Sequence, residues 1–200
     1  MPKITLHSLG NANQTQKDFA TKAIRRLKAV LNDEEFISRV SEADYSGRKF
    51  KADDGSDTEA TNEQIVEIIT TGKERKTDPD NEIDLQIKLS PLEDGVAGSV
   101  TPPSRIITTS TTYFNEWMEG KQPLSLAAHW MHEWLHVAGF RNVNSDGKPD
   151  TNDVNYSIGR FVVEIGRQHL LDDGVSEAMA SLDGQGYLDS SVEHLDTVQE

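Results

Sequence analysis

The sequence predicts an α+β domain with a small twisted mixed sheet, one long helix packed against it and a helical C-terminal part. Residues 83–90 alternate apolar and polar side chains, which is typical of a strand with one buried face. Residues 16–31 and 123–139 instead repeat apolar side chains at helical spacing. The 200 residues suffice for one sizeable core, and they contain no internal repeat.

The N-terminal quarter of the chain is predicted to hold a strand and a helix. Residues 3–9 alternate and predict a short strand. Residues 16–31 predict an amphipathic helix, while residues 35–40 fit either a strand or a helix. Residues 43–62 are rich in Asp, Gly, Ser, Lys and Thr, so we expect a loop there.

A second helix, residues 61–72, has both a start and a stop signal. Thr61 can cap its first turn together with Gln64 three residues later, and Gly72 can end it. The polar run that follows, "KERKTDPDNE", predicts a loop before the strand at residues 83–90.

The C-terminal half alternates strand, helix and loop. After a connection rich in Pro and Gly, residues 104–111 predict a strand. The helix at residues 123–139 has Pro123 near its first turn and Gly139 just past its end. Residues 142–153 predict a polar loop.

We assign residues 1–170 to one domain and residues 171–200 to an acidic tail. Residues 156–171 predict the last long helix of the domain, despite two internal glycines. The final 30 residues contain eight acidic residues and no Lys or Arg, so we expect a solvated tail with one short helix at "SEAMASL".

Charge and composition exclude several classes of function. A net charge of −14 argues against binding of nucleic acid or of an anionic membrane, and suits metal cations and neutral or basic substrates. The absence of cysteine excludes disulfides, thiolate metal sites and a cysteine nucleophile. No apolar run resembles a signal peptide or a membrane span, so we expect a cytoplasmic protein, with non-classical export or incorporation into a virion left open.

The most informative stretch is His132-Glu133-Trp134-Leu135-His136. Residues four apart on a helix share a face, so His132 and His136 can direct two imidazoles at one zinc ion. Glu133 can then act as general base towards a metal-bound water. The alternative is an ordinary helix that packs into the core through Trp130 and Leu135.

The run "HEWLHVAGF" resembles the metzincin pattern H-E-x-x-H-x-x-G-x-x-H, with Gly139 allowing the chain to turn towards a third ligand. Residues 62–165 resemble a little-characterised family of bacterial and phage zincin-like proteins through "NEQIVEIITTG", "NEIDLQIKLS", "RIITTSTTYF", "HEWLHVAGF" and "DVNYSIG", in that order. The resemblance implies a zincin-like fold with an active-site helix. It also implies a zinc-dependent peptidase, in which the strand at residues 104–111 corresponds to the edge strand that aligns an extended peptide.

The sequence departs from this pattern at the third zinc ligand, where Asn142 replaces histidine. Asn142 could ligate weakly, or a carboxylate of Asp146, Asp150 or Asp153 could replace it. In a third alternative the site is degenerate and cleaves nothing. His129 lies near the same helix face, and we expect it to support the site or to lie on the surface.

The loop at residues 142–153 also resembles the calcium loops of EF-hand and dockerin modules. Its spacing suits a hard cation, although a plain solvated loop is the alternative. If calcium takes Asn142, only the two histidines remain for zinc. The residues that would supply oxygen ligands are Asn142, Asn144, Asp146, Lys148, Asp150 and Asp153.

"DVNYSIG" matches the family segment except at Asn155, where proline is usual. Tyr156 could donate a hydrogen bond to an oxyanion, or could pack on the core. Met179 is the only downstream methionine that could underlie a metal, but its surroundings predict a helix.

The leading functional prediction is therefore a zinc-dependent endopeptidase that hydrolyses peptide bonds in a peptide or protein substrate through a metal-activated water. The alternative is a degenerate zincin fold that serves as a structural or interaction protein of a phage or secreted assembly, stabilised by calcium at residues 142–153.

Overall fold

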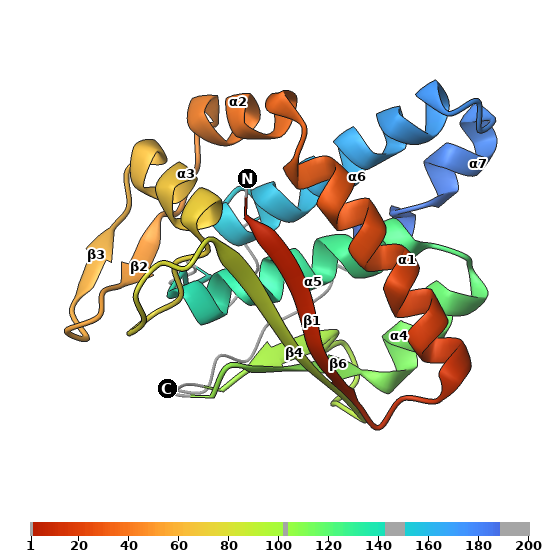
Figure 1. Ribbon diagram of the computed structural model, residues 1–200, viewed down its shortest axis with the longest axis horizontal. Helices are drawn as coiled ribbons and strands as arrows, with labels where there is room; N and C mark the ends of the chain where they lie inside the picture. The colour runs from red at the N-terminus through yellow and green to blue at the C-terminus, as the bar shows by residue number, and fades with distance from the viewer. Residues whose placement is uncertain (1, 102–103, 143–150, 189–200) are drawn as a thin grey trace.

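The computed structural model describes residues 2–101, 104–142 and 151–188. These residues form an α+β fold with seven helices, a mixed four-stranded sheet and a separate two-stranded hairpin, as Figure 1 shows. Within these ranges, none of the helices is both long and apolar enough to pass through a lipid bilayer.

The four-stranded sheet has the order β1-β4-β6-β5. Strands β1 (Lys3–Gly10), β4 (Glu82–Ser90) and β6 (Ile106–Ser110) run parallel to one another. Strand β5 (Gly98–Val100) is antiparallel to β6. The three predicted strands are therefore confirmed. Strand β6 lies inside the sheet, however, so the prediction that it is the edge strand was wrong; β5, in the connection rich in Pro and Gly, takes the edge.

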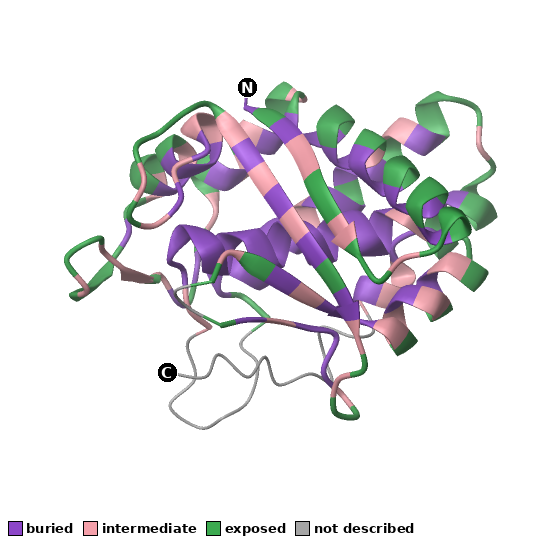
Figure 2. Cartoon of the chain, turned by 60° about the horizontal axis from the view of Figure 1, so that its bottom comes forward, coloured by how far each residue is buried: buried purple, intermediate pink, exposed green. Residues whose placement is uncertain are grey.

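One face of the sheet is buried and the other is partly open to solvent. In β4 the side chains of Ile83, Leu85, Ile87 and Leu89 are buried, and the residues between them are half-buried or exposed. Figure 2 shows this alternation as purple and lighter bands along the strand. The apolar residues of the predicted alternation thus lie on the face of the sheet that packs on the helices.

Capping residues set the ends of the helices in the first half of the chain. Helix α1 (Gln14–Leu31) starts with a capping box at Asn13, and α3 (Asn62–Thr71) starts with the predicted box of Thr61 and Gln64. Gly72 ends α3 in the left-handed conformation, as predicted. The ambiguous residues 35–40 belong to a helix, α2 (Glu34–Glu42), which is capped by Asp33.

Two segments differ from the prediction. Residues 43–62 contain a hairpin of β2 (Lys49–Lys51) and β3 (Asp57–Glu59) within the expected loop. Its strands have only three residues each and are mostly polar, so they carry no alternating signal. Helix α4 (Thr111–Glu119), which follows β6 directly, was not predicted either.

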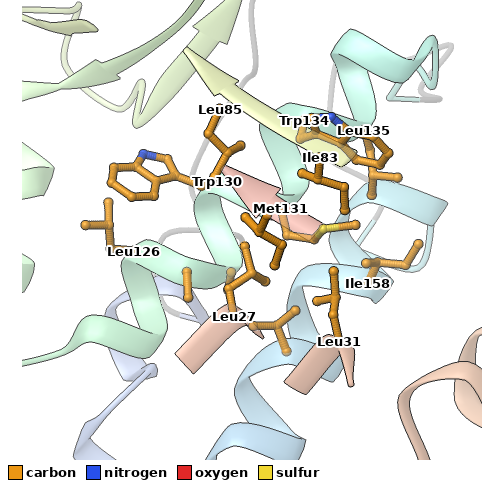
Figure 3. Close-up of a cluster of buried hydrophobic side chains, with 14 of the residues drawn as sticks. Leu27, Leu31, Ile83, Leu85, Leu126, Trp130, Met131, Trp134, Leu135 and Ile158 are labelled. Carbon is orange, nitrogen blue, oxygen red and sulfur yellow. The ribbon is translucent and has the colours of Figure 1, made fainter. Parts of the chain in front are cut away.

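The core is built around helix α5 (Pro123–Ala138), in which every residue from Leu124 to Ala138 is buried. Figure 3 shows Trp130, Met131 and Trp134 of this helix among side chains from three other elements. Those side chains are Ile83 and Leu85 of β4, Leu27 and Leu31 of α1, and Ile158 of α6 (Val154–Asp172). A helix buried on every side must be surrounded by other elements, and α5 lies between the sheet and helices α1 and α6.

The described part of the predicted acidic tail packs on the domain. Helix α7 (Glu177–Leu182) buries Ala180, and the residues after it bury Asp183 and Tyr187. Asp183 accepts a hydrogen bond of 2.8 Å from the backbone N–H of Leu124, in the first turn of α5. Met179 is 56% exposed, so it does not lie beneath a metal site.

Burial raises the pKa of Asp183 to about 6, against 3.8 for an unshifted aspartate. The folded state therefore binds more protons than the unfolded state between these two values, and the contribution of Asp183 to stability falls as the pH rises through this window. We expect Asp183→Asn to gain about 1 kcal/mol of unfolding free energy relative to the wild type between pH 5 and pH 7.5. Urea unfolding at the two pH values measures this gain. Asp172→Asn, an exposed carboxylate on α6, serves as the control, and an equal change in both variants would contradict the role of Asp183.

Candidate metal centre

The chain turns sharply after the H-E-x-x-H segment, at Gly139. This glycine has φ 119°, and a β-carbon there would lie 2.8 Å from the carbonyl oxygen of Lys51. The residues after the turn pair with β2 through hydrogen bonds from Lys51 N–H to Gly139 O (2.9 Å) and from Arg141 N–H to Lys49 O (3.0 Å). The turn predicted at Gly139 is confirmed, and strand β2 of the unpredicted hairpin holds it in place.

His132 and His136 lie side by side on one face of α5. Their ring centroids are 5.1 Å apart, and both side chains are buried. Nδ1 of His136 lies 2.9 Å from the carbonyl oxygen of Phe140. A carbonyl can only accept a hydrogen bond, so Nδ1 carries the proton and Nε2 keeps a lone pair that can ligate a metal.

His132 is held by two tyrosines. Its Nδ1 lies 3.2 Å from the hydroxyl of Tyr187, and its ring packs edge-to-face on Tyr156 with centroids 4.5 Å apart. When Nδ1 donates to the Tyr187 hydroxyl, Nε2 of His132 is the ring nitrogen that carries the lone pair. The expected position of Tyr156 beside the site is therefore observed, whereas Tyr187 was not anticipated.

Gly159 makes room for Tyr187. A β-carbon on Gly159 would lie 2.0 Å from the Tyr187 hydroxyl oxygen, closer than any side chain permits. A glycine inside a helical pattern often marks a close approach of this kind, so Gly159 was the one available sign that something packs there. The sequence did not indicate which residue that would be.

Glu133 lies beneath the edge strand β5, next to His129. Its side chain is 1% exposed, and its Oε1 is 3.8 Å from Nδ1 of His129. A β-carbon on Gly98 of β5 would lie 2.6 Å from the same carboxylate oxygen. The predicted general base is thus buried between the helix and the sheet edge.

The tautomer of His129 follows from its neighbours. The indole N–H of Trp130 donates to Oγ1 of Thr109 (3.1 Å), and this hydroxyl lies 3.3 Å from Nε2 of His129. When the hydroxyl gives its own proton to Nε2, the protonated Nδ1 of His129 faces Glu133. His129 is buried and is placed to support Glu133. The expectation that it could lie on the surface was therefore wrong.

The amide of Asn155 also contacts His136. Its Nδ2 lies 3.0 Å from Nδ1 and 3.2 Å from Nε2 of the ring. The lone pairs of the two ring nitrogens point away from each other, so one amide group near both must lie over the ring face rather than block Nε2. Asn155 is fully buried, and its Oδ1 has no hydrogen-bond partner within the described ranges. The site therefore contains an additional oxygen donor that the sequence did not single out.

Within the described residues, no third His, Asp or Glu side chain completes a ligand group with His132 and His136. The one such group there is His7, Glu82 and Asp84, on the partly open face of β1 and β4. Asp153 is fully buried and caps α6 by accepting the N–H of Tyr156 at 3.0 Å.

Asn142 is half-buried, and Asn144, Asp146, Lys148 and Asp150 lie outside the described residues. The calcium loop and the third zinc ligand therefore stay predictions.

Two imidazoles held through their Nδ1 atoms fit a zinc ion, which prefers nitrogen donors in a fixed orientation. Water and an oxygen donor such as Asn142 would fill the remaining positions. A search of protein-family models, curated proteins and solved structures found no match to the chain.

Proposed function

We propose that the protein is a zinc-dependent endopeptidase with a zincin-like fold. The observation that carries this proposal is the arrangement of helix α5. His132 and His136 lie one turn apart with Nδ1 of each placed against a fixed partner, and Glu133 is buried between helix and sheet edge. An incidental pair of core histidines would need no carboxylate at this position.

The sheet supplies the second argument. β5 is the antiparallel edge strand of the four-stranded sheet and lies against Glu133 and His129 through Gly98. An extended peptide can add to such an edge by backbone hydrogen bonds, which would bring a peptide bond close to Glu133. This is the role that the resemblance to zincins assigns to the edge strand.

Zinc, when bound, polarises the substrate carbonyl and lowers the pKa of a bound water towards about 7. Glu133 would take the proton of that water on its carboxylate and return it to the leaving amine. His129, with Nδ1–H directed at Glu133, would hold the carboxylate in place. Tyr156, packed on His132, would donate a hydrogen bond from its hydroxyl to the developing oxyanion.

One observation favours a second candidate function. Because no third His, Asp or Glu side chain completes a ligand group with the two histidines within the described residues, the site could have lost catalysis. The fold would then serve as a structural or interaction module, with calcium at the loop 142–153 as its stabilising ion. Zinc content and hydrolysis distinguish the two functions.

We expect purified protein to hold about one zinc per chain after reconstitution, since two oriented imidazoles form the core of the site. His136→Ala should lose the zinc, and His7→Ala, in the exposed group on β1 and β4, should keep it. Plasma mass spectrometry after dialysis gives the metal content. Zinc retained by His136→Ala, or none in the wild type, would refute the metal centre.

Glu133→Gln should keep its zinc but hydrolyse peptides at least about 100-fold more slowly, because the amide cannot accept the water proton. Cleavage of a complex peptide mixture, followed by mass spectrometry, measures the rate. Glu116→Gln, an exposed residue of α4, is the matched control and should match the wild type. Equal rates for Glu133→Gln and the wild type would show that Glu133 is not the base.

Tyr187→Phe should weaken zinc binding about tenfold, because it removes the hydroxyl that orients His132. Competition with a chromophoric chelator measures this affinity. Tyr45→Phe removes another buried hydroxyl, which donates to the carbonyl of Val40 far along the chain from the site, and should leave the affinity unchanged. The same affinity in both variants would mean that Tyr187 does not orient the histidine.

A further inference from the structure

We propose that a cationic cleft beside His136 selects polypeptides with an acidic side chain close to the bond that is cleaved. The inference rests on the proposed peptidase function and names its substrate class. It concerns Arg75, Lys76 and Arg105, which have no part in the metal centre.

The cleft has a volume of about 440 Å³ and lies between strand β5, the end of helix α5 and the turn that follows α3. Val100 of the edge strand β5 forms one wall, and His136 and Val137 at the end of α5 form another. The three cationic side chains also line it. An occupant of this cleft would therefore contact the edge strand, a candidate zinc ligand and a cluster of positive charge at once.

The turn that carries Arg75 and Lys76 is fixed to the rest of the fold. The backbone N–H of Arg75 donates to the carbonyl of Val137 at 3.2 Å, which places this residue at the end of the H-E-x-x-H helix. Asp53 accepts hydrogen bonds from the Lys73 ammonium (2.7 Å) and from the backbone N–H of Lys76. These hydrogen bonds fix the backbone of the turn that carries Arg75 and Lys76.

Lys73 and Arg105 each form an ion pair within the protein, and Arg75 forms none with a described residue, although its charge acts on the carboxylate of Asp53. Arg105 forms an ion pair of 3.2 Å with Glu74, and Lys73 pairs with Asp53. Glu74 is buried and also accepts the indole N–H of Trp134; burial raises its pKa. The Arg75 guanidinium forms no hydrogen bond or ion pair with any described residue, although its Nε is shielded from solvent.

A shielded guanidinium N–H without an acceptor is unfavourable, and a carboxylate that binds the planar group through two oxygens would satisfy it. The overall charge of −14 opposes long polyanions such as nucleic acids. A single carboxylate responds mainly to charges within the screening length of about 8 Å, so the local cations decide its binding. An acidic side chain of a peptide paired with β5 carries a single carboxylate and would lie close to these cations.

The proposed substrate class differs from the one expected from composition. The net charge suggested neutral or basic substrates, but it averages over the whole surface. The side chains that line the cleft include three cations, whereas the net charge of the whole chain is −14.

The test uses zinc-loaded full-length protein with Glu133→Gln, so that bound peptide is not cleaved. Two probes are compared by NMR titration: the acetylated and amidated hexapeptide Ala-Ala-Ala-Glu-Ala-Ala and its counterpart with Gln in place of Glu. We expect the Glu peptide to bind about tenfold more tightly at low salt, as for a charged hydrogen bond, and the preference to shrink at high salt.

Adding Arg75→Gln should abolish the preference for Glu, and adding Lys76→Gln, which changes an exposed side chain, should reduce it. Lys17→Gln removes one positive charge from the exposed face of α1 and should change nothing. Equal binding of the two peptides, or a preference that survives Arg75→Gln, would overturn the inference. Inorganic phosphate that binds more tightly than the Glu peptide would also overturn it, since the cleft would then be a general anion site.

The two proposals fail separately. Protein with Glu133 intact that binds the Glu peptide selectively but cleaves no peptide supports the cleft and contradicts the peptidase. Protein that cleaves peptides without regard to acidic residues, and equally with Arg75→Gln, contradicts the cleft alone.

Discussion

Helix α5 is buried on every side, and the surrounding structure must satisfy the polar groups that it carries. An amphipathic helix would turn its histidines and its glutamate to water. Here each buried polar group has to be matched by another element, because leaving one unmatched costs about 1–3 kcal/mol. Thr109 of β6 accepts the Trp130 indole, Glu74 of the loop after α3 accepts the Trp134 indole, and the carbonyl of Phe140 holds His136.

The same requirement explains why distant segments meet at one place. The sheet contributes Thr109 and Gly98, the segment after α7 contributes Tyr187, and α6 contributes Tyr156 and Asn155. Apart from α6, which is the next element after α5, these segments are separated from α5 by other elements of the chain. The result is a set of side chains whose orientations are fixed by neighbours rather than by solvent, which is the condition that metal binding and acid–base chemistry share.

Elements with a strong periodic pattern or a cap could be predicted from the sequence. The alternation in β4, the capping box of α3, and Pro123 and Gly139 at the ends of α5 act locally, so the predictions there were close. The three-residue strands β2, β3 and β5 were missed because they exist only through pairing with distant partners.

The candidate site divides in the same way. His132, Glu133 and His136 could be placed together because they share one helix. Tyr156 could be placed near them because it lies in the segment that resembles the zincin-like family. Tyr187, Asn155 and the roles of His129 and Arg75 depend on tertiary contacts, which spacing along the chain does not encode. Composition also does not show which cations form ion pairs, because the pairs of Lys73 with Asp53 and of Arg105 with Glu74 are set by the fold.

The contact of Tyr187 with His132 links the candidate metal centre to the segment around α7. The hydrogen bonds that hold this segment include one from Gly186 N–H to Gln122 (2.7 Å) and one from Arg167 Nε to the carbonyl of Asp183 (2.8 Å). Opening this segment alone would leave α5 folded but release one histidine from its orienting partner. By linkage, if the proposed zinc ion prefers the oriented histidine, its binding would also favour the closed segment, and metal occupancy would be coupled to local unfolding of the C-terminal segment.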